Sequence, residues 1–80
     1  MRVTVNVTRR PEIADPQGRT VARALKELGH EAVRQVRIDR TIHLDIDGDD
    51  ADQIHNQVDS MCRAVLTNPV LEDYEIEIER

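Results

Sequence analysis

The chain has 80 residues with a formal net charge of −5 at pH 7, and it contains one Tyr, no Phe and no Trp. This length predicts a single domain over residues 1–80, and the acidic, aromatic-poor composition argues against nucleic-acid binding, which needs a basic face and usually stacking aromatics. No apolar run is typical of a membrane span or a signal peptide. The single cysteine, Cys62, excludes an internal disulfide and favours a reducing, cytoplasmic location.

The first two elements are a strand and a helix. Residues 2–8 alternate strictly between valine and polar side chains, which predicts a half-buried strand. Apolar residues then recur at helical spacing over residues 21–28. Asp15 is well placed as the N-cap and Pro16 as the first helical residue, while Gly29 stands where a helix commonly ends with positive φ.

The rest of the chain adds three strands and one helix. Alternation over residues 34–39 and 41–47 predicts two strands, which should pair as a hairpin because only the Asp39-Arg40 region separates them, although the strong Asn-Gly turn signal is absent. Apolar residues over 51–65 mark one face of a second helix. The alternating segment 74–80 predicts the last strand.

The order of these elements is β-α-β-β-α-β. It predicts an α+β sandwich of the ferredoxin-like kind, in which two helices cover one face of a four-stranded, mostly antiparallel sheet. Each strand has a single apolar face, which agrees with helices on one side only.

Gly18 raises the question of a phosphate-binding loop, because it lies at the start of the first helix. The known loops need G-x-x-x-x-G-K-[ST] or G-x-G-x-x-G, which a lone glycine does not satisfy, and Asp15 would repel an anion. A plain helix cap is therefore favoured. The missing side chain of Gly18 suggests that a neighbour lies close to the helix start.

The aspartate-rich segment 45–52 suggests a calcium loop, but Gly48 falls too early after Asp45 for that pattern. The alternative is a turn followed by a capping box, with Asp50 as the cap and Gln53 three residues later. The capping box is the favoured interpretation.

The remaining polar candidates do not form a catalytic constellation. His30, His43 and His55 lie on separate predicted elements without metal-ligand spacing. Cys62 lies on the apolar stripe of its helix, and Ser60 has no triad partners around it. We therefore predict no catalytic residue, no cofactor site and no metal site in this chain, and the pattern alone indicates a small acidic binding or assembly module.

Several blocks of the sequence resemble the PurS family, the small subunits of phosphoribosylformylglycinamidine (FGAM) synthase. They are "DPQG", "ALKELGH", "VRQVRIDRTIHLDI", "MC" and "NPVLEDYEIEIE", at residues 15–18, 24–30, 33–46, 61–62 and 68–79. The first and last are the most specific. The chain departs from the family pattern at Asp39-Arg40, where a Gly-Lys pair is usual, and at His30, where an aromatic is common.

The resemblance implies a PurS-like fold and a non-catalytic subunit of a complex in purine biosynthesis. In such a complex a glutaminase subunit releases ammonia, and a synthetase subunit uses ATP to convert formylglycinamide ribonucleotide to formylglycinamidine ribonucleotide. The small subunit, as a dimer, bridges the two and assists ammonia transfer. ATP and magnesium are accordingly expected on the synthetase partner.

Two other classes share this order of elements. An acylphosphatase-like enzyme needs a glycine-rich anion loop carrying an arginine after the first strand, but no glycine precedes Gly18 here. A small-molecule-sensing regulatory domain of the ACT type would bind an amino acid at a dimer interface. A ligand-induced shift in melting temperature would support that alternative.

Self-association is the last expectation from the sequence. A core built without Phe or Trp rarely supplies more than about 3–5 kcal/mol in so short a chain. We therefore predict a homodimer or larger assembly, with segment 68–74 contributing to the interface. The candidate interface residues are Gly18, Pro69, Val70, Leu71 and Tyr74.

Overall fold

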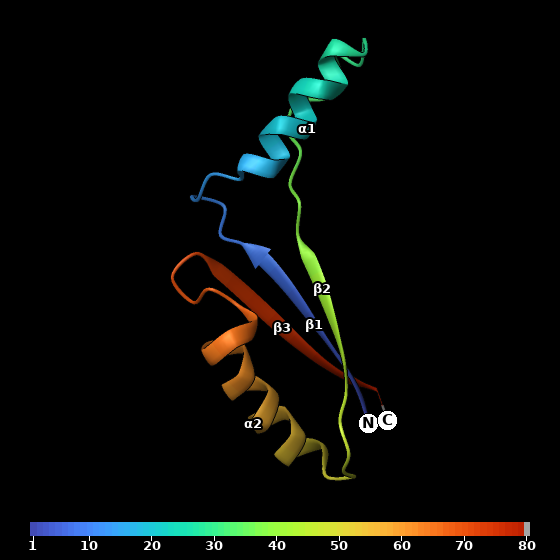
Figure 1. Cartoon of the computed structure of the whole chain (residues 1–80), viewed down its shortest axis with the longest axis vertical. Helices are drawn as coiled ribbons and strands as arrows, with labels where there is room; N and C mark the ends of the chain where they lie inside the picture. The colour runs from blue at the N-terminus through green and yellow to red at the C-terminus, as the bar shows by residue number, and fades with distance from the viewer. Residues whose placement is uncertain (80) are drawn as a thin grey trace.

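The computed structural model describes residues 1–79 (Figure 1). In chain order the elements are β1 (Arg2–Arg9), α1 (Pro16–Glu27), β2 (Arg40–Asp45), α2 (Ala51–Met61), the π-helical turn η1 (Cys62–Leu66) and β3 (Glu72–Glu79). Arg80, which ends the predicted last strand, lies outside the described residues.

The three strands found in residues 1–79 form an antiparallel sheet in the order β2-β1-β3, with Val5 opposite Ile42 on one side and Ile76 on the other. The alternation in β1 buries its valines on the face that α2 covers, as predicted. Three residues of α2 and η1 complete the buried core, which consists of Val3, Val5, Val7, Ile54, Val58 and Cys62.

The prediction of a four-stranded sheet was wrong for the described residues, because segment 34–39 joins no strand ladder. The predicted hairpin is also absent there: the chain runs on in one direction from this segment into β2 (Figure 1). Within residues 1–79 only Gly29 and Gly48 have positive φ, so the Asp39-Arg40 pair does not adopt the backbone of a tight hairpin turn.

The prediction that both helices cover the sheet was wrong as well. α2 packs on the sheet, whereas α1 stands beyond its end (Figure 1). We call residues 11–39 the arm; it comprises loop 11–15, helix α1 and the return segment 28–39. The arm makes the molecule 50 Å long, with a radius of gyration of 16.2 Å. A compact chain of this length would have a radius of gyration of about 12 Å.

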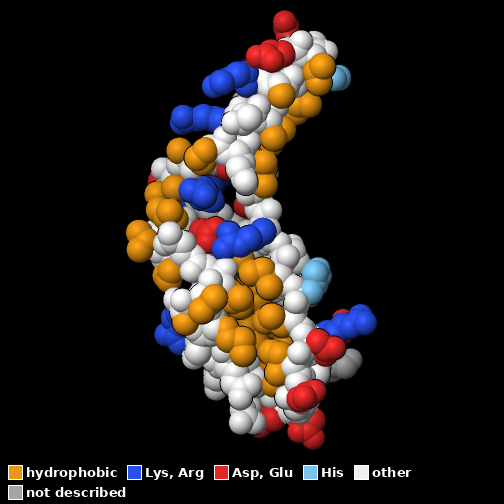
Figure 2. Space-filling model, in the orientation of Figure 1, with side chains coloured by type: hydrophobic (Ala, Val, Ile, Leu, Met, Phe, Trp, Pro, Cys, Tyr) orange, Lys and Arg blue, Asp and Glu red, His pale blue; other side chains and the backbone are white. Residues whose placement is uncertain are grey.

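Because α1 is not on the sheet, apolar surface remains uncovered. Figure 2 shows hydrophobic side chains gathered beside α2 and continuing along one edge of the arm. Ile42 and Leu44 of β2 are only half-buried. On the arm, the exposed fractions are 38% for Val21, 75% for Leu28 and 39% for Ile38. The sequence predicted that the apolar face of the first helix would be buried. The structure has this face on α1, but it is left exposed in the single chain.

Candidate functional site

The junction between the arm and the sheet is held by several side-chain hydrogen bonds to backbone groups. Asp15 is the N-cap of α1, as predicted, and its Oδ1 accepts a hydrogen bond from the Gly18 N–H at 2.9 Å. Its other oxygen, Oδ2, accepts from the Ile38 N–H at 2.8 Å. The hydrogen bonds from Ile38 and Gly18 hold the pKa of the Asp15 carboxyl below its usual value. One carboxylate thus joins the start of the helix to the end of the return segment.

Gly18 is required by the close approach of the return segment. A Cβ at this position would lie 2.0 Å from the carbonyl oxygen of Val36. This is the close neighbour that the sequence suggested, and it comes from the same chain. Since the Gly18 N–H binds Asp15, the structure supports the cap and not the phosphate loop.

Arg37 fastens the return segment to the end of β1. Its guanidinium Nη2 donates to the carbonyl oxygens of Arg9 at 2.9 Å and Arg10 at 3.2 Å, and its Nη1 donates to that of Ile13 at 3.4 Å. The planar fork of arginine reaches several acceptors at once, which a lysine ammonium does not match geometrically. Sequence reasoning missed this residue, because its place in the alternation predicted a solvent-facing side chain.

Below this point Arg40 anchors the start of β2 to β3. Its two terminal nitrogens pair with the two carboxylate oxygens of Glu72 at 2.6 and 2.9 Å, and Nη2 also donates to the Leu66 carbonyl at 2.8 Å. Glu72 is buried and accepts a further bond from the Asn68 N–H at 2.8 Å. The Arg40 hydrogen bonds lower the pKa of Glu72 and raise the pKa of Arg40. The Arg40–Glu72 ion pair holds Arg40 at the start of β2, in register with Val7 of β1. A hairpin turn at residues 39–40 would take Arg40 out of this position.

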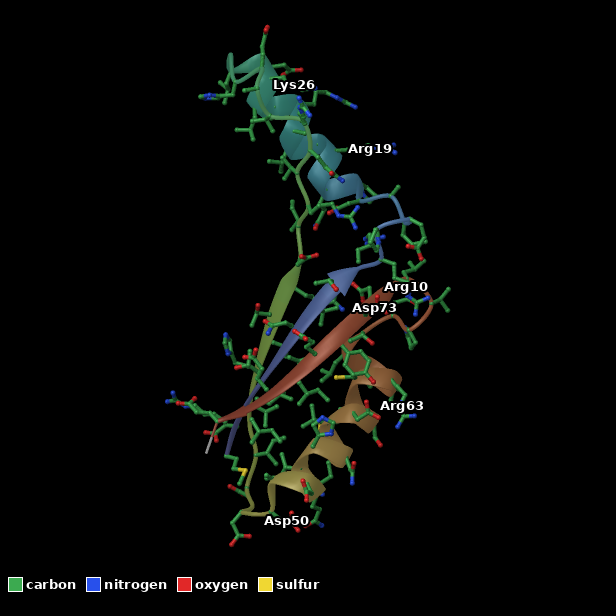
Figure 3. The ribbon with its side chains drawn as sticks, turned by 180° about the vertical axis from the view of Figure 1, so that it is seen from behind. Arg10, Arg19, Lys26, Asp50, Arg63 and Asp73 are labelled. Carbon is green, nitrogen blue, oxygen red and sulfur yellow. The ribbon has the colours of Figure 1, made fainter. Side chains whose placement is uncertain are left out.

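A third arginine braces the turn that precedes β3. Arg10 Nε donates to Asp73 at 3.2 Å, and Nη2 donates to the Pro69 carbonyl at 2.8 Å (Figure 3). The side chain of Val70, in the same turn, is 73% exposed. The turn is therefore held in shape while it presents an apolar side chain to solvent.

The five candidate interface residues fall at different places. Gly18 is buried at the junction, Pro69 and Val70 are exposed, and Leu71 and Tyr74 are half-buried. The Tyr74 hydroxyl donates to Asp59 of α2 at 2.5 Å, and this bond is the main reason that its pKa is raised. Their role in an interface stays a prediction.

The other candidates have structural roles. Asp50 is the N-cap of α2, as predicted, and its Oδ1 accepts from the backbone N–H groups of Asp52 and Gln53. The return bond from the Gln53 side chain that would complete a capping box is not among the hydrogen bonds of residues 1–79. Cys62 is fully buried, and burial raises the pKa of its thiol. Residues 1–79 contain no cluster of three His, Cys, Asp or Glu side chains arranged to hold a metal ion. In the same range no helix has the length and apolar character needed to cross a bilayer.

Charge is distributed unevenly along the chain, and the excess of positive charge lies at the junction, where Arg9, Arg10 and Arg40 flank an arm whose own formal net charge is zero. Residues 9–40 contain eight of the eleven Lys and Arg residues but only five of the sixteen Asp and Glu residues. Their formal net charge is therefore +3, whereas the remainder carries −8. Figure 3 shows Arg19 and Lys26 on α1, far from Asp50 at the opposite end of the molecule.

Comparison with known proteins gives a consistent result. The family model PurS, described as phosphoribosylformylglycinamidine (FGAM) synthase, matches residues 2–80. The FGAM synthase subunit PurS of Methanocaldococcus jannaschii is 34% identical over 79 residues, which cover 99% of this chain and 95% of that protein.

Two solved structures extend this likeness to the fold. The PurS structure from Bacillus subtilis has a TM-score of 0.88 at 37% identity and covers 99% of this chain and 98% of its own. A chain in the PurLQS structure from Thermotoga maritima has a TM-score of 0.81 at 30% identity, with 95% of this chain and 93% of its own covered.

Proposed function

Because the chain belongs to the PurS family of FGAM synthase subunits, we propose that it bridges the glutaminase and synthetase subunits of that enzyme and assists the transfer of ammonia between them. The complex is a ligase of purine biosynthesis. In this proposal the synthetase subunit holds ATP and magnesium and converts formylglycinamide ribonucleotide to formylglycinamidine ribonucleotide. The chain itself contributes binding surfaces in the cytoplasm.

The observation that carries the proposal is the likeness to a chain of the Thermotoga maritima PurLQS structure. The shape supports it independently, because a 50 Å long chain with an exposed apolar arm gains stability when other chains cover that surface. The ACT-type alternative is not favoured, since the matching family model over residues 2–80 is PurS.

Self-association is part of the proposal. The elements that the sequence predicts for the missing side of the sandwich are all in the arm: an amphipathic helix and an extended segment. A second copy can supply them, so that each arm covers the open part of the other sheet, beside Ile42 and Leu44, in a symmetric exchange.

The test of the bridge uses the reconstituted enzyme with and without this chain. Free ammonia at high concentration reaches the synthetase from solution, whereas ammonia from glutamine needs the bridge. We expect removal of the chain to abolish glutamine-dependent synthesis and to leave most ammonia-dependent synthesis. Equal loss of both would mean that the chain builds part of the synthetase active site, and equal retention would refute the bridge.

The test of self-association is sedimentation equilibrium at micromolar concentration. A dimer or larger species is expected, and a monomer would refute this part of the proposal. Full exposure of Pro69, Val70 and Leu71 in the assembly would remove segment 68–74 from its interface.

A further inference from the structure

The arm is joined to the sheet in a way that demands a separate restraint. Two stretches of chain cross the junction, residues 10–14 going out and residues 36–40 coming back, and α1 does not pack on the sheet. An element held by two connecting segments without lateral packing is free to pivot at them, unless other bonds restrain it. The junction therefore determines the direction in which the arm points.

We propose that Asp15 and Arg37 form a clamp that holds the arm in one direction, and that this direction allows a second copy to dock. The second half of the inference rests on the self-association proposed above. The clamp consists of the five hydrogen bonds that these two side chains make with backbone groups. The close contact of Gly18 with Val36 completes it.

The two side chains act on different parts of the junction. Asp15 links the N–H groups of Gly18 and Ile38, so it keeps the helix start and the return segment together. Arg37 links the return segment to the carbonyl oxygens of Arg9 and Arg10, at the end of β1. Asp15 thus makes the base of the arm one unit, and Arg37 fixes that unit to the sheet.

A fixed direction matters for pairing because association restricts any part that was free before. An arm that is already fixed in the docking direction loses little conformational entropy on association, whereas a pivoting arm loses more and so binds more weakly. In a symmetric dimer both arms carry the same junction, so each loss of the clamp acts twice. Clamp variants should therefore weaken pairing even though neither side chain belongs to the apolar surface.

Asp15→Asn separates the clamp from the cap. The asparagine oxygen can still accept from Gly18, but the NH₂ group that replaces the second oxygen cannot accept from the Ile38 N–H. Asp50→Asn is the matched control, because Asp50 uses a single oxygen, Oδ1, for both cap bonds to its own helix. Both variants replace a capping aspartate with asparagine, but only Asp15→Asn also removes a hydrogen bond to the return segment.

Arg37→Met is the second test variant, and it carries the test alone if Asp15→Asn does not fold. Its control is Arg34→Met, because the Arg34 side chain is exposed and forms no hydrogen bond or ion pair within the described part of the chain. Folding of each variant is checked first by circular dichroism.

The direction of the arm is measured inside one chain. Spin labels are attached at Lys26→Cys on α1 and Gln57→Cys on α2, both exposed positions, and labelled chains are diluted with unlabelled ones. The buried thiol of Cys62 does not compete for the label. Pulsed electron–electron resonance then gives the distribution of the distance between labels, and sedimentation gives the dissociation constant of the unlabelled variants.

We expect narrow distributions for the wild type and both controls, and broad ones for Asp15→Asn and Arg37→Met. The dissociation constant should rise by about tenfold or more in the two clamp variants, the scale of one lost charged hydrogen bond. A broad distribution in the wild type, or narrow ones in both clamp variants, would overturn the clamp. Broad distributions with unchanged dissociation constants would overturn its role in docking. A wild-type monomer with a narrow distribution would refute self-association and docking but support the clamp.

Discussion

Replacing Gly18 with alanine tests the close approach at the junction. The new methyl carbon would lie 2.0 Å from the Val36 carbonyl oxygen, whereas carbon–oxygen contacts of this kind are stable at about 3.3–3.6 Å. The return segment must therefore move away by roughly 1.3 Å or more. Such a movement stretches the hydrogen bond between the Ile38 N–H and Asp15, which is 2.8 Å long.

Two effects of this substitution oppose each other. Alanine is favoured over glycine inside a helix by about 1 kcal/mol at most, and Gly18 lies in the first turn, where the gain is smaller. Overpacking against backbone costs about 1–3 kcal/mol. The clash should win, so that Gly18→Ala destabilises the junction by about 1–2 kcal/mol.

The effect should be local and is best read by native-state hydrogen exchange. Since 1.4 kcal/mol corresponds to about tenfold, the Ile38 amide should exchange about 5–30 times faster, while the Val5 amide in the central strand should not change. Gly29→Ala is the control, because Gly29 has a φ of +99° but no atom within 4 Å of the added carbon. It should strain only the end of α1. Unchanged or slower exchange at Ile38 in Gly18→Ala would show that the added carbon does not displace the return segment.

Three further predictions concern β3. Arg40→Met leaves the buried Glu72 carboxylate without its ion pair; because the Arg40 side chain is half exposed, we expect a loss of about 1–2 kcal/mol in urea unfolding, less than for a fully buried pair. Because the folded pKa of Glu72 is lowered from 4.5, its stabilisation is complete above pH 4.5 and is lost as the pH falls through the lowered value. Glu72→Gln should therefore flatten the acid limb of a stability–pH curve, and an unchanged acid limb would contradict the ion pair. Tyr74 is the single tyrosine, so ultraviolet titration reports it directly; its pKa should lie above 10 and fall in Asp59→Asn, and an unchanged value would contradict the hydrogen bond.

The elements that the sequence predicted well are those set by neighbours along the chain. The valine alternation in β1, the cap at Asp15, the positive φ of Gly29 and the cap at Asp50 all depend on local spacing and backbone geometry. The family was identified correctly from the same short blocks.

The arrangement of the arm could not be predicted in the same way. The alternation of Val36 and Ile38 indicates an extended segment, but it does not say which strand, or which chain, lies beside it. Arg37 and Arg40 resemble ordinary surface arginines in sequence. Their partners lie 24 to 32 positions away, so only the folded chain shows that they hold the junction.

Residues 34–39 run into β2 without a hairpin turn, and this affects the rate of folding. The sheet and α2 make their contacts within one chain, so they can form in a step whose rate does not depend on protein concentration. Within residues 1–79 the apolar side chains of Val21, Leu28 and Ile38 on the arm stay exposed, and in the proposed dimer their burial has to wait for an encounter with a second chain. Refolding should accordingly show a fast first-order phase for the sheet, followed by a second-order phase that accelerates in proportion to the concentration of chains.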